Sequence, residues 1–347
     1  MRYEFVADND AEAEVLESHP MIKPLFDPLL PVIQARSLMA AVDFGIFDAI
    51  GRESRSVEGI ADALELDAGT LEMILRVLVC AGYVACNERL YELTETTSTT
   101  LLSGSPAPLT SWVKYNYTHW ELIGQMEEVL QKGKGCDRHR LLKSRESWAA
   151  YQNAMLETAR PAAQWIAGHI PVADGATKLL DIGGSHGLYG AMICRAHPPI
   201  QSEVLELPEA LEHARKLAHD EGIDDIVSHR VGDALTEDFG LQTLDVAFLG
   251  NITHQFSAEQ NLDLFRKIRS ALRRDGTLAI WDFKKPDPKS RPDLVSDGLA
   301  LLFRIGSATR CYPSEEYIEW MKSAGFGDIR IHPAPAPAQI LITGRAL

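Results

Sequence analysis

The chain has 347 residues, more than one ordinary hydrophobic core organises, so two domains are expected. Its composition, 46% hydrophobic and 24% charged, is typical of a soluble globular protein, and its net charge of −15 argues against nucleic acid or an anionic membrane surface as a partner. Five cysteines without a C-x-x-C pair predict reduced thiols in a cytoplasmic protein and argue against a disulfide framework or a zinc site.

The first third of the chain predicts a winged helix. The opening MRYEFVADND lacks the basic and apolar regions of a signal peptide, and no run is expected to reach the roughly 18 apolar residues of a membrane-spanning helix. Ser56 is expected to cap a short helix, and a second helix buries a face formed by Leu71, Ile74, Leu75 and Leu78 and ends at Gly82. YVACNERLYEL predicts two strands around a turn at Asn87 and Glu88. We assign this domain to residues 1–105, followed by a helical connector over 106–172.

Strand-like runs alternate with helical segments over residues 173–347. The runs are KLLDI, SEVLEL, IVSHRV, LDVAFLG and TLAIWDF. This alternation predicts a parallel, doubly wound α/β sheet. Ser257 and Gln260 form a capping box at the start of one helix. The runs 327–332 and 338–344 are joined by a linker too short for a crossover helix, so they should be antiparallel neighbours.

A glycine-rich loop, KLLDIGGSHGLYG, follows the first of these strands. The carboxyl ends of parallel strands form a ligand crevice, and glycine lets the loop backbone approach a ligand closely. Glu206 closes the second strand, where it can accept both hydroxyls of a ribose, and Asp233 follows the third, where it can accept an exocyclic amine beside Ala234. A dinucleotide also uses such glycines, but Asp181 would add negative charge beside a pyrophosphate. S-adenosylmethionine, a sulfonium with an amino-acid tail, fits these elements better.

Together these motifs resemble those of the small-molecule O-methyltransferases of plants and bacteria that carry an N-terminal winged-helix dimerisation domain. The resemblance runs from about residue 30 to the end and rests on LLDIGGSHG, LELP, GDAL, the segment from NITHQF to AIWDF, and YPSEEYIEWMKSAGF. It implies a Rossmann-like class I methyltransferase domain with a mostly parallel seven-stranded sheet, S-adenosylmethionine as donor, a small aromatic or polyketide-like acceptor of secondary metabolism, and a homodimer formed through the N-terminal domain. The predicted cofactor-binding residues are Asp181, Gly183, Gly184, Gly187, Glu206, Leu207, Asp233 and Ala234.

His254 matches the catalytic histidine of the family's LHDW-like motif, which here is THQF. A neutral histidine can take the proton of a hydroxyl near pH 7, so His254 is the predicted general base. Asp282, at the end of the fifth strand, matches the first acid that orients this histidine. Cys311 stands where the family has a second acid. Either Asp282 suffices alone, or the acceptor is unusual, for instance an enolisable carbon that is C-methylated. His186 is expected to be structural.

The acceptor pocket is implied by the same resemblance. Its predicted residues are Tyr115, His119, Trp120, Met155 and Phe303. No metal is expected, since His119 and His254 would offer only two ligands.

Two functions other than that of an enzyme are also compatible with parts of the sequence. The winged helix allows a ligand-sensing regulator, but the second helix carries a single base, Arg76, which argues against DNA contacts and for a subunit interface. A catalytically silent cofactor-binding protein is the third hypothesis, because of Cys311.

Overall fold

The computed structural model describes residues 6–7, 9–19, 21–307, 309–335 and 338–347. The chain forms two compact units, one ending at Tyr117 and the other running from Thr118 to Leu347. Helix α8 (Thr110–Ile123) contains the boundary between them.

The N-terminal unit contains short helices and a three-stranded antiparallel sheet of order β1-β3-β2. Its elements are α1 (Asp10–Ser18), α2 (Ile22–Phe26), α3 (Leu30–Asp43), α4 (Ile46–Ile50), β1 (Arg55–Ser56), α5 (Val57–Leu64), α6 (Ala68–Cys80), β2 (Val84–Asn87), β3 (Leu90–Leu93) and α7 (Glu95–Thr100). The predicted order of helix, turn, helix and hairpin is confirmed.

Local signals explain the two central helices of this unit. The Ser56 side chain accepts a hydrogen bond from the Gly59 N–H and caps α5. Helix α6 buries Leu71, Leu75 and Leu78, whereas Ile74, expected on the same face, is only partly buried. The hairpin turn lies one residue later than predicted, with left-handed backbone at Glu88 and Arg89.

One helical run is apolar and long enough to span a membrane, contrary to the expectation from sequence. Among the described residues, Ile22–Asp43 reaches a mean hydropathy of 1.3. The core helix of a soluble protein passes the same test. Here Met39, Ala41 and Val42 are buried in the hydrophobic core of the N-terminal unit, and the run is interrupted between α2 and α3.

The C-terminal unit is built on a seven-stranded sheet of order β6-β5-β4-β7-β8-β10-β9. Its strands are β4 (Lys178–Ile182), β5 (Gln201–Glu206), β6 (Val227–Val231), β7 (Leu244–Gly250), β8 (Leu272–Phe283), β9 (Phe326–His332) and β10 (Gln339–Ala346). The first five are parallel, and β10 pairs antiparallel with both β8 and β9. The predicted doubly wound sheet and its antiparallel last pair are confirmed.

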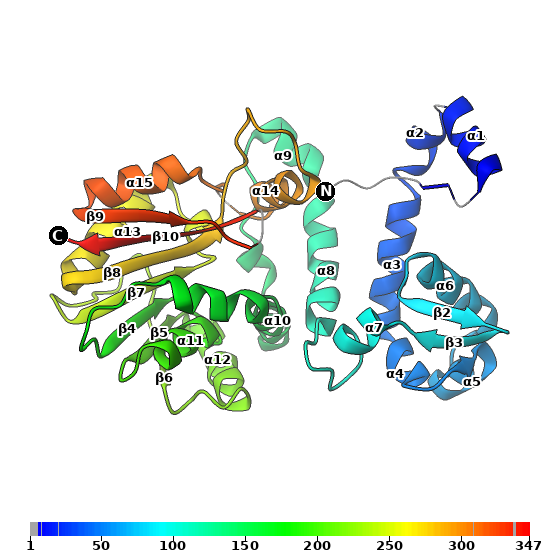
Figure 1. The fold of residues 1–347 in the computed structure, drawn as a ribbon, viewed down its shortest axis with the longest axis horizontal. Helices are drawn as coiled ribbons and strands as arrows, with labels where there is room; N and C mark the ends of the chain where they lie inside the picture. Colours follow the sequence, from blue (N-terminus) through cyan, green and yellow to red (C-terminus); the bar gives the residue numbers. More distant parts are fainter. Residues whose placement is uncertain (1–5, 8, 20, 308, 336–337) are drawn as a thin grey trace. The chain divides into compact units, whose positions relative to one another are not determined.

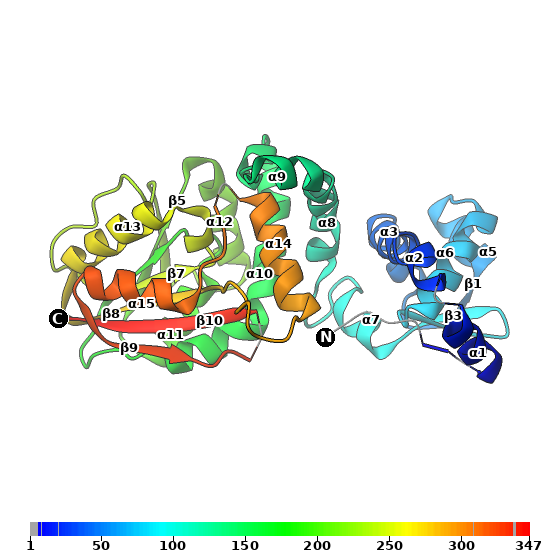
Figure 2. The same ribbon diagram turned by 90° about the horizontal axis from the view of Figure 1, so that it is seen from above.

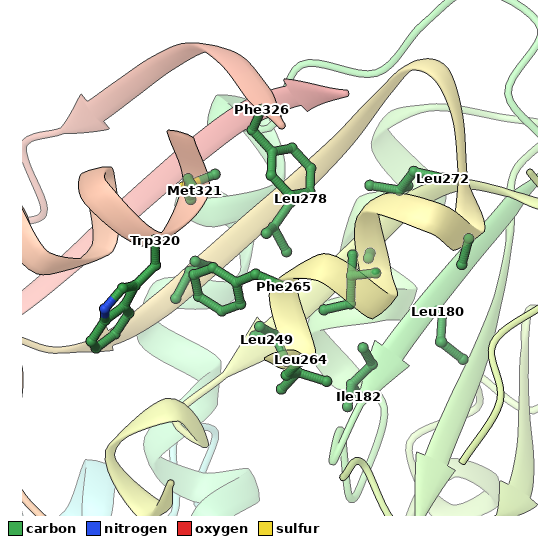
Figure 3. Close-up of a cluster of buried hydrophobic side chains, with 14 of the residues drawn as sticks. Leu180, Ile182, Leu249, Leu264, Phe265, Leu272, Leu278, Trp320, Met321 and Phe326 are labelled. Carbon is green, nitrogen blue, oxygen red and sulfur yellow. The ribbon is translucent and has the colours of Figure 1, made fainter. Parts of the chain in front are cut away.

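Helices cover both faces of this sheet (Figure 1). One face carries α10 (Arg145–His169), α11 (Leu188–Ala196) and α12 (Pro208–Asp220), and the other carries α13 (Ala258–Ala271) and α15 (Ser314–Ser323). The predicted Ser257–Gln260 capping box starts α13. Figure 3 shows Phe265 of α13 and Met321 of α15 beside Leu278 of the sheet.

A smaller helical layer lies at one side of the unit (Figure 2). It consists of the last turns of α8 together with α9 (Met126–Lys132), the 3-10 turn η1 (Arg138–Leu141) and α14 (Leu294–Gly306). Leu122, Val129 and Ile305 form its hydrophobic core. Arg138 donates from Nε to the Gly306 carbonyl oxygen over 3.1 Å, so its guanidinium satisfies the carboxyl end of α14.

Side chains of β4 point alternately to the two faces of the sheet, and this places Asp181 beneath the glycine loop. Leu180 and Ile182 face α13, whereas Leu179 and Asp181 face α11, and Asp181 is completely buried. Gly184 passes directly over this carboxyl group: a Cβ there would lie 2.3 Å from Asp181 Cγ. Gly183 has φ +68°, and a Cβ on it would lie 2.4 Å from Ile252 Cδ1. The loop therefore requires glycine at both positions.

We expect Gly184→Ala to destabilise the protein by about 1–3 kcal/mol, the usual range for forcing atoms into a packed site. The methyl group must displace the Asp181 carboxyl group, which is itself buried. Gly168→Ala is the matched control, because Gly168 is an exposed residue of α10 with no atom within 4 Å of its built Cβ. It should be neutral or slightly stabilising. Thermal unfolding of the two variants checks this, and equal melting temperatures would contradict it.

Candidate active site

A cavity of about 400 Å³ lies at the carboxyl ends of the parallel strands. Its wall is formed by the loops that follow β4, β5, β6 and β7 and by one face of α10. This is the crevice where open α/β sheets bind ligands, and its volume suits a small molecule. The predicted site residues that line it are Asp181, Gly183, Gly184, Glu206, Leu207, Asp233, Ala234 and Met155.

Gly187 is not part of the cavity lining and instead occupies the N-cap position of α11. The neighbouring His186 is buried and accepts a hydrogen bond at Nδ1 from the Leu188 N–H. Burial, with the charge of Arg160 adding to it, lowers the pKa of His186 to about 3. His186 therefore stays neutral, and its hydrogen bond with Leu188 attaches the glycine loop to the start of α11.

Asp181 is a buried acid that forms no ion pair with any residue the structure describes. Burial raises its pKa to about 7, the charge of Glu206 adds to this rise, and the Gly190 N–H opposes it. Neither carboxyl oxygen has a well-aligned hydrogen-bond donor among the described residues. A positively charged ligand group would favour the ionised form, so the site fits an ammonium group.

Glu206 is oriented by the backbone around it. Oε2 accepts from the Ser185 N–H over 3.0 Å, and Oε1 accepts from the Leu207 N–H over 2.7 Å. Burial raises the pKa of Glu206, and these two hydrogen bonds oppose the rise. Each oxygen retains lone pairs for further donors, such as ligand hydroxyls.

Ser185, which occupies a position with φ +46°, is held by hydrogen bonds. Its Oγ accepts from Gln152 Nε2 over 3.0 Å, and His229 Nε2 lies 2.9 Å from its carbonyl oxygen. These contacts offset the backbone strain of a non-glycine residue in this region.

Two amide oxygens in the cavity wall have no hydrogen-bond partner within the described part of the chain. They belong to Gln152 and to Asn251, which follows β7. Buried polar atoms are normally satisfied, so both acceptors point to a ligand with N–H or O–H donors. With Asp181 and Glu206, they fit the amino-acid and ribose groups of S-adenosylmethionine.

One helix face that contributes to the cavity is absent from the sequence-based prediction, apart from Met155. Trp148, Tyr151, Gln152 and Met155 recur at helical spacing along α10, and all line the cavity. His139, in η1, stacks on Trp148 with ring centroids 5.7 Å apart and meets the edge of Tyr151 at the same separation. The i, i+3, i+4, i+7 spacing is the signal that identifies this face.

The predicted base and acid form a buried pair. His254 belongs to the 3-10 turn η2 (Thr253–Gln255) after β7, and its Nδ1 lies 2.6 Å from Asp282 Oδ1. Both residues are 2% exposed or less. Burial alone would raise the pKa of Asp282, but the His254 charge and hydrogen bonds from His254, Thr253 and the Phe283 N–H lower it. Asp282 is therefore a carboxylate that accepts from Nδ1 and leaves Nε2 of His254 as the basic atom.

Aromatic rings and a buried thiol surround this pair. The Phe303 ring centroid lies 4.3 Å from that of His254, and Phe283 lies 6.5 Å away. Cys311 is also buried, and burial, reinforced by the charge of Asp282, raises the pKa of its thiol. The thiol stays protonated, so Cys311 does not supply the charge of a second acid.

Tyr115, His119 and Trp120 are not among the residues that line this cavity. His119 is buried, and burial and the Arg138 charge lower its pKa to about 4. Trp120 is 41% exposed, and Tyr115 is a buried residue of the N-terminal unit. Within the described residues, no three His, Cys, Asp or Glu side chains are placed to hold a metal ion.

Comparisons with known proteins agree with this geometry. Residues 139–327 match the model of the O-methyltransferase domain, and residues 31–103 match that of the O-methyltransferase dimerisation domain. The N,N-dimethyltransferase OxyT of Streptomyces rimosus is 25% identical over 86% of this chain and 92% of its own. A 3-hydroxy-5-methyl-1-naphthoate 3-O-methyltransferase of Streptomyces sahachiroi is 23% identical over 86% of this chain and 87% of its own.

The fold is also that of solved methyltransferases. Human N-acetylserotonin methyltransferase in complex with SAM superposes with a TM-score of 0.83 at 18% identity, over 98% of this chain and 99% of that one. The matched family model covers more than half of the chain, including the strand ends that form the cavity. The chain therefore belongs to the O-methyltransferase family with an N-terminal dimerisation domain, and it is a methyltransferase whose methyl donor is S-adenosylmethionine.

Proposed function

We propose that the protein methylates a hydroxyl group of a small metabolite, with His254 as the general base. The observation that carries this proposal is the buried hydrogen bond of 2.6 Å between His254 Nδ1 and Asp282 Oδ1. Gln255 and Phe256, which follow His254 directly, line the cavity. The pair therefore lies next to the cavity in which we propose that the donor binds.

Each member of the pair has a separate task. Asp282 holds the proton on Nδ1, so that Nε2 can take the proton of the acceptor hydroxyl. Its negative charge then stabilises the imidazolium that forms. S-adenosylmethionine, when bound, supplies a methyl group on a sulfonium, which an oxygen nucleophile attacks. Positioning of the acceptor supplies much of the remaining acceleration.

The cavity residues are proposed to hold the donor through complementary chemistry. Glu206 would accept the ribose hydroxyls, Asp233 the exocyclic amine, and Asp181 the ammonium group. The unpartnered oxygens of Gln152 and Asn251 support this assignment, because both need donors. Ala234 and Leu207 supply apolar wall.

Aromatic surroundings favour an aromatic or polyketide-like acceptor. The Phe303 and Phe283 rings lie 4.5 Å apart, both near the His254 ring. Of the two relatives named above, one is named for methylation at oxygen and the other at nitrogen. We favour oxygen because a buried His–carboxylate pair serves to deprotonate a hydroxyl, whereas a carbon acceptor that arrives already enolised has no need of such a base. C-methylation remains the second candidate because Cys311 replaces an acid.

Homodimer formation through the N-terminal unit is also proposed. Apolar side chains of α2, α3, α6 and the turn before α3 are exposed there, namely Leu25, Leu29, Leu30, Val32, Ile33 and Met73. Leu30 and Ile33 line a groove of about 630 Å³ together with Arg76 of α6. An apolar surface of this kind suits another protein subunit better than nucleic acid.

The five free thiols accord with a cytoplasmic location.

Glu206→Ala should weaken the binding of S-adenosylhomocysteine by about 10-fold or more, since hydrogen bonds to a charged group contribute roughly 1.5–3 kcal/mol. Glu203→Ala is the control, because Glu203 lies on the same strand but forms a surface ion pair with Arg230. Titration calorimetry measures both affinities. Unchanged binding by Glu206→Ala would remove this residue from the site.

His254→Ala should lower turnover by about 10²–10⁴-fold, the usual contribution of a positioned base, and leave cofactor affinity nearly unchanged. Asp282→Asn should lose less, because it removes orientation and charge support only. His219→Ala, at an exposed surface histidine, is the control. In the pH–rate profile of the unmodified enzyme, the limb near the histidine pKa should disappear in His254→Ala. If that limb survives, it belongs to the acceptor and His254 only lines the pocket.

Ile33→Glu should shift the protein from a dimer toward its 38.4 kDa monomer, because it places a charge on the exposed apolar surface of α3. Leu241→Glu, at a residue that is 78% exposed in the C-terminal unit, should leave the mass unchanged. Light scattering at micromolar concentration measures both. A stable monomer of the unmodified chain contradicts the proposal.

A further inference from the structure

A chain of buried hydroxyl groups lies behind Asp282. Thr253 donates from Oγ1 to Asp282 Oδ2, and the Tyr317 hydroxyl of α15 lies 2.7 Å from the same Thr253 oxygen. All three residues are 0% exposed. These direct hydroxyl contacts therefore connect α15 through η2 to the end of β8.

The direction of these hydrogen bonds follows from proton counting. A hydroxyl has one proton, and Thr253 uses its proton on the carboxylate, so Tyr317 donates to Thr253. Burial, reinforced by the charge of Asp282, raises the pKa of Tyr317 well above its ordinary value, so the phenol keeps its proton. Hydrogen bonds in such a chain strengthen one another.

Both oxygens of Asp282 are consequently occupied. Oδ1 accepts from His254 Nδ1 and from the Phe283 N–H over 2.7 Å, while Oδ2 accepts from the Thr253 hydroxyl and from the His254 N–H over 3.2 Å. The carboxylate cannot turn away from the histidine ring. Its negative charge is also shared among several donors, which weakens its pull on a proton of His254.

We propose that Thr253 and Tyr317 are positioning residues, which fix Asp282 against His254 and thereby hold the histidine proton on Nδ1. This rests on the proposed role of His254 as the base.

The side chains around Thr253 and Tyr317 allow the effect of these two hydroxyl groups to be measured separately from other charges. Tyr317 on α15 and the adjoining Cys311 and Tyr312 all have raised pKa values, with burial as the largest cause, and stay neutral. The other charged groups that act on this cluster are Arg138, which acts on Cys311, and Arg310 and Glu316, which both act on Tyr312. The η2 backbone is held independently, since Asn261 donates to the Thr253 carbonyl oxygen over 3.0 Å. Removing the Thr253 hydroxyl therefore leaves the turn in place.

The test compares variants that differ by single hydroxyl groups. Thr253→Val and Tyr317→Phe remove a donor from the chain, and Thr253→Ser restores it. Tyr312→Phe is the matched control, because its hydroxyl donates to the Phe256 carbonyl oxygen of the same loop over 2.6 Å but not toward Asp282. We expect Thr253→Val to lower kcat by about 10-fold, with a smaller loss in Tyr317→Phe, as loss of one hydrogen bond to a charged group implies.

The decisive measurement is the pKa of His254 itself, read by NMR on full-length protein with labelled histidine and assigned through His254→Ala. A carboxylate with fewer donors attracts the imidazolium more strongly, so the His254 pKa and the kinetic limb should both move to higher pH in Thr253→Val. Thr253→Ser and Tyr312→Phe should leave both in place.

The outcomes distinguish this inference from the proposed function. An unchanged His254 pKa and ring tautomer in both Thr253→Val and Tyr317→Phe overturns the positioning role, whatever happens to turnover. If the NMR values shift while the kinetic limb does not follow, the positioning role stands and the general-base role fails. If Thr253→Val does not fold, Tyr317→Phe alone decides, because it leaves the Thr253 side chain intact.

Discussion

A carboxylate buried at the end of β8 organises the catalytic half of this enzyme. Removing an ionised acid from water is costly unless hydrogen bonds and an opposite charge replace the lost solvent. Asp282 obtains these from His254, from Thr253 and from the backbone of Phe283, so its pKa falls despite complete burial. The position of η2, the packing of α15 against it and the orientation of the histidine ring all follow from satisfying this one group.

Asp181, at the end of β4, shows the opposite solution at the same edge of the sheet. It is equally buried, but among the described residues no cation is paired with it, and its pKa rises to about 7. All the hydrogen bonds that Asp282 needs come from the protein, whereas a positively charged ligand would favour the ionised form of Asp181. In the proposed function, two identical side chains therefore serve acceptor activation and donor binding because their surroundings differ.

Sequence reasoning succeeded where the signal is local or depends on strand order. The Ser257–Gln260 box and the strand-end acids were predictable because capping and parallel topology determine them. Apart from Met155, the α10 face that lines the cavity was not predicted, because aromatic residues at helical spacing normally indicate a core. The hydroxyl chain from Tyr317 to Asp282 joins residues 29 and 64 positions apart along the sequence, and no short motif encodes it. The apolar run Ile22–Asp43 was underestimated because its composition was judged without its helical length.

The contact between Gly184 and the Asp181 carboxyl group also restricts how this loop can change over evolutionary time. A side chain at 184 and an acid at 181 exclude each other, so position 184 can gain a side chain only if Asp181 is replaced by a smaller residue. Ser185 is different, because its side chain extends to Gln152 and displaces nothing. Substitutions that retune the binding loop among relatives should therefore accumulate at position 185, paired with compensating changes at 152 on the opposing helix.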